Sequence, residues 1–350
     1  MYKLALGALV SLMFILSPVA EAQAAGRPHA SAKKHSVKKV KRKDVGDAVA
    51  AGKPRMVRHV SVVRGKRVVT FRPVRSANFI VAPAARSAGD AAGLNLTRDP
   101  LALASNVAFV LDQTSSEVLF EKNANVALPI ASITKLMTGL IVVQAQQDMN
   151  EMLSVTEEDI DHEKHTSSRL SVGSRMTRGD LLHIALMSSE NRAASALGRN
   201  YPGGITAFVA AMNAKAKELG MNDTRYVDSS GLSSRNVASA RDLAKLAVVA
   251  HQEPLLREYS TDPKTEVDAG GRIMHYSNTN RLVANPDWDI GLQKTGFINE
   301  AGRCLVMQAM IQGRAVIMVF LDSKGKLSRT ADAGRMRKWL EALKQPPGIG

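Results

Sequence analysis

Apolar and polar positions alternate in blocks from residue 106 onward, and the blocks predict a mixed α/β domain. The apolar run 107–112 (VAFVLD) is followed by a polar stretch at 113–116 and by a second run at 117–121 (EVLFE). Two short apolar runs joined by a polar turn are typical of a β-hairpin. We therefore expect this part of the chain to open the domain as two antiparallel strands.

Longer apolar segments predict helices further along the chain. Pro129 disfavours helix before it, and residues 133–147 are densely apolar at helical length. Residues 181–187 (LLHIALM) form a second apolar helix, and residues 290–297 are expected to be a strand. A last helix at 330–343 is expected to pack on the sheet through Met336, Trp339, Leu340 and Leu343.

The first 24 residues have the three-part order of a secretory signal peptide. Lys3 precedes an apolar run at 4–16, and small residues follow around Ala22 and Ala24. The apolar run is short for a membrane span, so we expect export with cleavage after one of these alanines rather than an uncleaved anchor.

Charge divides the chain in two. The net charge is +15, and residues 26–75 hold 16 Lys and Arg against 2 Asp and Glu. We expect residues 25–97 to be a basic, disordered linker, because such a segment buries too little apolar surface to offset its ordering entropy. Residues 60–71 are the exception and predict a short strand pair turning at Gly65.

The linker allows two interpretations. Its charge suits an anionic wall polymer or a membrane surface, and a solvated spacer has the same composition. Nucleic acid is not an expected partner, because export removes the chain from the chromosome and the basic segment has almost no aromatic residues for base stacking.

Ser132 lies one helical turn before Lys135 in the segment LPIASITKLMT. A serine hydroxyl is a poor nucleophile until a base takes its proton, and a lysine in a low-dielectric pocket is neutral enough to do so. A helix N-terminus adds N–H groups that favour an oxyanion. Alone, the spacing is weak, because a helix-capping serine beside an exposed lysine has it too.

Two further motifs change that assessment. Ser189 and Asn191 form a Ser-x-Asn after the second apolar helix, and Lys294 opens a Lys-Thr-Gly. This ordered set is typical of serine penicillin-interacting enzymes. Over residues 98–342 the sequence resembles the serine DD-peptidases, the low-molecular-mass penicillin-binding proteins. The segments SSENRAA, DSSGLSS and SNTNRLV resemble their D-alanyl-D-alanine endopeptidase branch, typified by penicillin-binding protein seven.

The resemblance implies a role for each residue of the first two motifs. Ser132 would attack the carbonyl of the penultimate D-alanine, or of a D-configured cross-link, and form an acyl-enzyme, with Lys135 as its base. Ser189 would relay a proton to the leaving amine, and Asn191 would hold the lysine and the substrate backbone. Glu190, in the variable middle position, receives no role.

The third motif would bind substrate. By resemblance, Lys294 and Thr295 would hold the terminal carboxylate, and Gly296 would let the substrate backbone approach the strand. The backbone N–H groups of Ser132 and Phe297 would form the oxyanion hole. The two motif lysines are expected to converge on one cleft, where like charges lower the pKa of one of them.

The resemblance implies an α/β fold with an antiparallel five-stranded sheet flanked by helices, plus a helical lobe. The expected organisation is a signal peptide at 1–24, the linker at 25–97, a catalytic domain at 98–343 and a tail at 344–350. The active site would lie between sheet and lobe, with no metal and no cofactor.

The expected function is hydrolysis of D-alanyl bonds in peptidoglycan stem peptides in the periplasm, foremost DD-endopeptidase cleavage of cross-links, with β-lactams as covalent inhibitors. DD-carboxypeptidase action uses the same residues and is the first alternative. A catalytically silent cationic wall-binding protein is the second.

Related enzymes are less compatible with the sequence. A class A β-lactamase adds a glutamate in a deacylating loop, and the candidates between the second and third motifs are single acids in helical or turn contexts: Glu218, Glu253, Glu258 and Glu266. The further β-domain and membrane helix of carboxypeptidases of the penicillin-binding protein five type are not expected, since seven residues follow Leu343.

Other chemistry-bearing residues predict no second site. His162 and His165 are three apart, whereas a zincin needs its histidines four apart on one helical face. His183 lies in an apolar helix and is expected to be a core histidine. Cys304 is the single cysteine, which excludes an intramolecular disulfide, and its strand-like surroundings predict a buried, inert thiol.

Overall fold

The computed structural model describes residues 56–63, 66–73 and 86–343. The chain divides into two compact units, with the boundary between residues 80 and 81. The described part of the first unit is a hairpin of β1 (Met56–Val63) and β2 (Lys66–Pro73), with Val63 opposite Lys66. It is the strand pair predicted around Gly65. The predicted signal peptide, the rest of the predicted linker up to residue 85 and the predicted C-terminal tail lie outside the described residues.

The second unit contains a segment that the sequence assigned to the linker. Helix α1 (Ala88–Ala91) and the 3-10 turn η1 (Leu94–Leu96) both precede residue 98. Ser87 caps α1 by accepting the N–H of Asp90, and its hydroxyl donates to Asp322 at 2.8 Å. The structure therefore places residues 86–97 against the catalytic unit.

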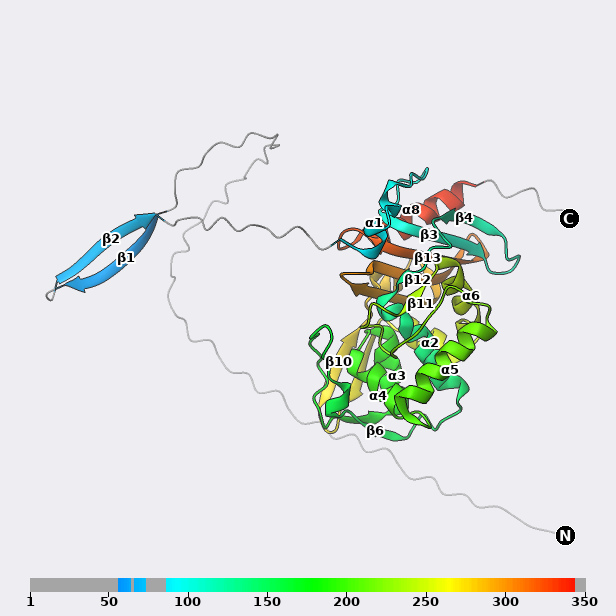
Figure 1. The fold of residues 1–350 in the computed structure, drawn as a ribbon, viewed down its shortest axis with the longest axis horizontal. Helices are drawn as coiled ribbons and strands as arrows, with labels where there is room; N and C mark the ends of the chain where they lie inside the picture. The colour runs from blue at the N-terminus through cyan, green and yellow to red at the C-terminus, as the bar shows by residue number, and fades with distance from the viewer. Residues whose placement is uncertain (1–55, 64–65, 74–85, 344–350) are drawn as a thin grey trace, which may run out of the picture. The chain divides into compact units, whose positions relative to one another are not determined.

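A five-stranded antiparallel sheet forms one half of this unit, in the strand order β11-β12-β13-β3-β4 (Figure 1). Its first hairpin is the one predicted from the apolar runs at 107–121. The sheet and its antiparallel pairing confirm the expected α/β architecture. The strands are β3 (Ser105–Asp112), β4 (Val118–Lys122), β11 (Asp289–Ile298), β12 (Gly302–Ile311) and β13 (Arg314–Ser323).

Helices cover both faces of the sheet. Neighbouring residues of a strand point to opposite faces, and in the central strands both sets are apolar, so both faces have to be buried. Val107 and Phe109 of β3 pack in the cluster that contains α6 (Ala240–Ala250), whereas Ala108 and Val110 pack in the cluster that contains α8 (Ser328–Ala342). Both clusters are buried, so the sheet is the centre of a three-layer arrangement.

The C-terminal helix α8 (Ser328–Ala342) packs on the sheet as predicted, with one correction. Met336 is fully buried, Leu340 nearly so, and Trp339 contacts the same cluster. Leu343 is 40% exposed, because the helix ends at residue 342 and the chain turns extended there. The helical spacing therefore predicted the buried positions correctly up to Leu340 and was wrong for Leu343.

The helical lobe forms the other half of the unit and surrounds α2 (Thr134–Gln144), the central apolar helix predicted at 133–147. Residues 134–142 of α2 are all buried, as expected for a helix that is apolar all round. Helix α6 packs against it from the sheet side, together with α3 (Arg178–Met187), α4 (Asn191–Arg199), α5 (Gly204–Glu218) and α7 (Pro254–Thr261).

Three two-stranded ribbons complete the lobe and its junction with the sheet. They pair β5 (Leu128–Pro129) with β8 (Val237–Ala238), β6 (Met152–Ser154) with β7 (Arg175–Thr177), and β9 (Lys264–Asp268) with β10 (Ile273–Ser277).

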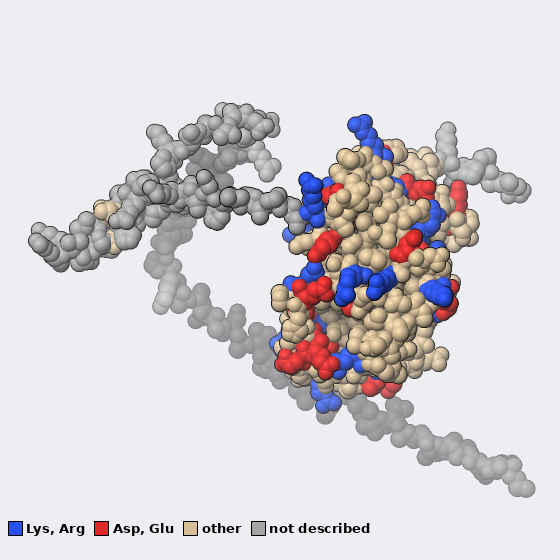
Figure 2. All heavy atoms as spheres, in the orientation of Figure 1, with Lys and Arg blue, Asp and Glu red and all other residues tan. Residues whose placement is uncertain are grey.

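Both signs of charge are interspersed on the face of the catalytic unit shown in Figure 2. This agrees with the composition of residues 76–350, which hold 30 Lys and Arg against 29 Asp and Glu. Among the helices that the structure describes, none has the length and apolar character needed to cross a bilayer.

Candidate active site

The predicted nucleophile stands on a strained turn between sheet and lobe. Ser132 lies in the 3-10 turn η2 (Ala131–Ile133), directly before α2, and Ala131 has a φ of 48°. Left-handed backbone is unfavourable for alanine and persists where surrounding structure imposes it. Here Gly231 packs so closely that a Cβ on it would lie 2.0 Å from the Ala131 carbonyl oxygen. The turn that aims Ser132 is therefore fixed by its neighbours.

Lys135 is fully buried and reaches three acceptors. Its Nζ lies 2.9 Å from Ser132 Oγ, 2.8 Å from Asn191 Oδ1 and 2.6 Å from the Ser230 carbonyl oxygen. Burial lowers the pKa of this lysine to about 7, although the charges of Asp228 and Glu190 act in the opposite direction. Near neutral pH, a large fraction of Lys135 is thus unprotonated and in contact with the serine hydroxyl.

The second motif forms the lobe wall beside this pair. Ser189 has a φ of 63° and links the end of α3 to the N-cap of α4. Asn191 accepts from Lys135 and donates through Nδ2 to Thr166 Oγ1 at 3.1 Å. The Ser189 hydroxyl has no hydrogen-bond partner within the described ranges, so it is available to a bound group.

Lys294 faces the first motif from β11. Its side chain is fully buried and donates to the Thr295 carbonyl oxygen at 2.9 Å. Burial, with the nearby charges of Lys135 and Arg329, holds the pKa of Lys294 well below its usual range. The structure therefore brings the two motif lysines close enough to interact, and each is driven toward its neutral form.

Gly296 and Phe297 complete the strand side. A Cβ on Gly296 would lie 2.8 Å from the Ile130 carbonyl oxygen and 3.2 Å from the Ser132 nitrogen, so the chain's own η2 turn already requires glycine there. The sequence had attributed this glycine to substrate approach. Phe297 is 50% exposed, and the guanidinium of Arg303 lies 4.5 Å from its ring centroid.

Two contributors to the site carried no role in the sequence analysis. The first is the DSSGLSS loop. Asp228 accepts hydrogen bonds from Gly231 N–H and Asn236 Nδ2, and these bonds hold the loop so that the Ser230 carbonyl oxygen accepts from Lys135. The second is Arg329 of α8, which donates to the Gly296 carbonyl oxygen at 2.8 Å. A backbone carbonyl has no side-chain signature, and Arg329 lies 33 residues after the glycine whose carbonyl it binds.

The residues set aside in the sequence occupy unremarkable positions. His162 and His165 are exposed, and His183 lies 3.1 Å from an Asp262 oxygen while stacking on Tyr259. Burial raises the pKa of the Cys304 thiol to about 12. Within residues 86–343 and the hairpin, no three His, Cys, Asp or Glu side chains gather as a metal site.

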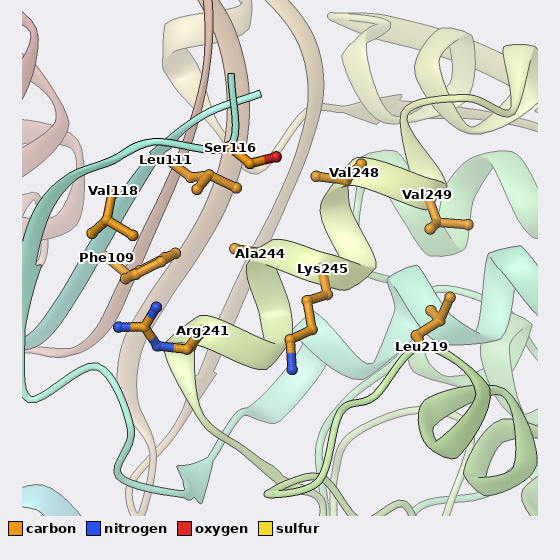
Figure 3. A pocket seen from close by; sticks show the side chains of 10 residues that line it. All are labelled: Phe109, Leu111, Ser116, Val118, Leu219, Arg241, Ala244, Lys245, Val248 and Val249. Atoms are coloured by element: carbon orange, nitrogen blue, oxygen red, sulfur yellow. The ribbon is translucent and has the colours of Figure 1, made fainter. Parts of the chain in front are cut away.

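An apolar cavity of about 400 Å³ lies elsewhere, between α6 and the β3–β4 hairpin (Figure 3). Its two cations already have partners: Arg241 pairs with Glu121 at 2.6 Å, and Lys245 pairs with Asp242 at 3.0 Å. It is lined by none of the predicted site residues.

At the start of the central helix, buried Lys135 is bonded to Ser132, and a second buried lysine, Lys294, faces them from a strand of the sheet. This arrangement is that of an active-serine hydrolase that works through an acyl-enzyme. The sequence model of one peptidase family, described as D-alanyl-D-alanine carboxypeptidase, matches residues 95–325. The chain belongs to this family of serine DD-peptidases, as its motifs predicted.

Individual relatives agree with this assignment. The D-alanyl-D-alanine endopeptidase of Pseudomonas aeruginosa is 48% identical over 252 residues, covering 71% of this chain and 80% of the relative. The D-alanyl-D-alanine endopeptidase of Escherichia coli is 43% identical over 247 residues, covering 70% of this chain and 80% of the relative. The family also contains carboxypeptidases, such as one from Bacillus subtilis at 29% identity over 254 residues, covering 67% of this chain and 62% of the relative.

Solved structures confirm the fold. A mutant of the Streptomyces K15 DD-transpeptidase superposes with a TM-score of 0.64 at 27% identity, covering 69% of this chain and 99% of that one. Penicillin-binding protein D2 of Listeria monocytogenes, in its cefotaxime-bound form, superposes with a TM-score of 0.62 at 29% identity, covering 69% and 98%.

Proposed function

We propose that this protein is a serine DD-endopeptidase that hydrolyses D-alanyl cross-links in peptidoglycan through an acyl-enzyme. The observation that carries the proposal is the 2.9 Å contact between Lys135 Nζ and Ser132 Oγ, at a lysine whose burial lowers its pKa to about 7. The endopeptidase names of the relatives at 43% and 48% identity support the choice of cross-links as substrate.

The reaction follows from these positions. Neutral Lys135 takes the proton of Ser132 Oγ as this oxygen bonds to the D-alanyl carbonyl carbon, and the backbone N–H groups of Ser132 and Phe297 stabilise the resulting oxyanion. The amide C–N bond then breaks, and Ser189 relays a proton to the departing amine. A water molecule hydrolyses the ester and releases Ser132.

The strand side binds the leaving half of the substrate. Lys294 and Thr295 hold the carboxylate next to the scissile bond, and Thr279 supports Thr295 through a 2.6 Å contact between the two hydroxyl oxygens. The charge of Arg329, whose pKa burial lowers to about 10, adds to the positive potential there. β-Lactams acylate the same serine.

We place this activity in the periplasm, after removal of residues 1–24. The basic segment that precedes residue 86 then either attaches the enzyme to an anionic wall polymer or membrane surface, or separates the catalytic domain from its exported N-terminus. Two observations support export: the relatives are bacterial enzymes named for D-alanyl-D-alanine peptides, and the first 24 residues have the signal-peptide pattern.

Chromatography of muropeptides after incubation with the full chain tests the function. Conversion of cross-linked dimers to monomers is expected, together with a covalent benzylpenicillin adduct by intact mass that Ser132→Ala abolishes. Loss of only the terminal D-alanine from monomeric pentapeptides would assign the chain to the carboxypeptidase activity of its family description. Wall binding without hydrolysis or adduct, lost on deletion of residues 26–85, would favour the cationic binding protein.

A further inference from the structure

A polar cavity of about 420 Å³ adjoins the predicted active site on its lobe side. It shares its wall with the catalytic group, because Ser189 and Asn191 line it and Asn191 accepts from Lys135. A substrate bound at Ser132 therefore passes close to this cavity. The remaining lining residues are Ser167, Ser168, Arg169, Ser188 and Glu190.

Glu190 is the unusual member of this lining. Its side chain caps α4, and the residue as a whole is only 8% exposed. One carboxylate oxygen, Oε1, accepts from Ser168 Oγ at 2.6 Å and from the Arg192 N–H at 3.4 Å. The other oxygen, Oε2, has no hydrogen-bond partner among the described residues, and the carboxylate forms no ion pair with any of them.

The neighbouring cations are committed to other acceptors, and Lys135, whose pKa Glu190 raises, is bonded to Ser132, Asn191 and Ser230. The guanidinium of Arg169 stacks 3.8 Å from the Tyr276 ring centroid and donates to the His275 carbonyl oxygen at 2.7 Å. Arg192 donates to the Leu170 carbonyl oxygen at 2.6 Å. The unpartnered oxygen is not among the fully buried atoms and Glu190 lines the cavity, so a cationic group bound there would find a free, negatively charged acceptor.

The substrate class supplies such a group. A D-alanyl cross-link is an amide between a D-alanine carbonyl and a side-chain amine, so the stem peptides contain a diamino acid. The stem that contributes the D-alanine keeps its own side-chain amine as an ammonium unless it is cross-linked in turn. This ammonium is the cation that a DD-endopeptidase meets next to the scissile bond.

We propose that Glu190 binds the free side-chain ammonium of the stem-peptide diamino acid and so determines which stem peptides the enzyme prefers. The inference rests on the proposed function, because it takes peptidoglycan stem peptides as the substrate. It gives the middle position of the Ser-x-Asn motif a specificity role and leaves the bond-breaking steps to the residues named above.

The test compares two substrates that differ only in this charge: purified cross-linked muropeptide dimers, and the same dimers with their free amines acetylated. For the wild-type full chain we expect kcat/KM to be about tenfold higher for the unmodified dimer, the size of one charge-assisted hydrogen bond. Glu190→Gln preserves the cap and the Ser168 contact, and the ratio is expected to fall to about one. Glu163→Gln, which removes an exposed charge from the same lobe segment, should leave the ratio unchanged.

The ratio separates specificity from general damage. Glu190 also raises the pKa of Lys135, so its substitution changes turnover of both dimers alike and cancels in the ratio. Benzylpenicillin acylation reports whether each variant is folded and active. Equal kcat/KM for both dimers in the wild type, or an unchanged ratio in Glu190→Gln, would overturn the inference.

A failure of the proposed function gives a different result. If the wild type cleaves neither dimer, the proposed DD-endopeptidase function is wrong. Binding of the two dimers is then measured by how strongly each one slows acylation by benzylpenicillin. Stronger protection by the unmodified dimer, lost in Glu190→Gln, would still support an ammonium site. Equal protection by the two dimers would reject it.

Discussion

The buried contact between Lys135 and Ser132 predicts how acylation depends on pH. Only the neutral lysine can take the serine proton, and its pKa is lowered to about 7. With that value, about 90% of the lysine is neutral at pH 8, about 10% at pH 6 and about 1% at pH 5. The second-order rate constant for benzylpenicillin acylation should therefore fall about tenfold per pH unit below 7 and level off above 8.

Stopped-flow or intact-mass kinetics of adduct formation between pH 5 and 9 measure this profile. Lys294 interacts with Lys135, so the acid limb reports a macroscopic value of the coupled pair. Removing a nearby negative charge lowers the pKa of a lysine, so Glu190→Gln should move the limb to lower pH. Lys135→Arg should abolish acylation throughout the range, because its guanidinium stays protonated.

Two results would refute the reasoning. A rate that is constant from pH 5 to 8 would show that Lys135 is not the group that titrates. A limb that moves to higher pH in Glu190→Gln would show that the carboxylate does not act on the lysine electrostatically. A thermal unfolding scan at pH 5 checks that loss of rate is not loss of fold.

Three further predictions concern the frame around the site. Gly231→Ala should lower both Tm and the benzylpenicillin acylation rate, the latter by tenfold or more, because the glycine has a φ of 81° and a Cβ would lie 2.0 Å from the Ala131 carbonyl oxygen; full activity would show that the η2 turn tolerates displacement. Asp332→Asn should destabilise the protein by about 1–3 kcal/mol in urea unfolding, since the buried carboxylate accepts both N–H and Oγ–H of Ser105, with activity per folded molecule kept. Cys304→Ala should leave acylation unchanged, and native protein should resist a thiol reagent that labels it in denaturant, because burial raises the thiol pKa to about 12; rapid labelling of the native state would contradict this.

The elements that follow local patterns were predictable from the sequence. The two apolar runs and the polar turn at 107–121 form β3 and β4, and the apolar run after Pro129 forms α2. The motif order also placed Ser132 and Lys294 on opposite walls of one site, because family motifs record which residues meet in space.

Long-range contacts without a local signature were not predictable. Residues 86–97 read as linker by composition, yet Ser87 bonds to a carboxylate 235 positions away. The Ser230 carbonyl acts on Lys135 through its backbone, which any residue type possesses. Helical spacing gave Leu343 a buried position that the end of α8 removes.

The packing of η2 has a consequence for cooperativity. On one side the turn touches Gly296 of the sheet, and on the other it touches Gly231 of the lobe. The orientation of Ser132 is thus a joint property of both halves, and neither half retains part of the activity when the other unfolds. In a urea titration, loss of benzylpenicillin acylation should coincide with whichever half unfolds first, so the serine is an internal reporter of the weaker half.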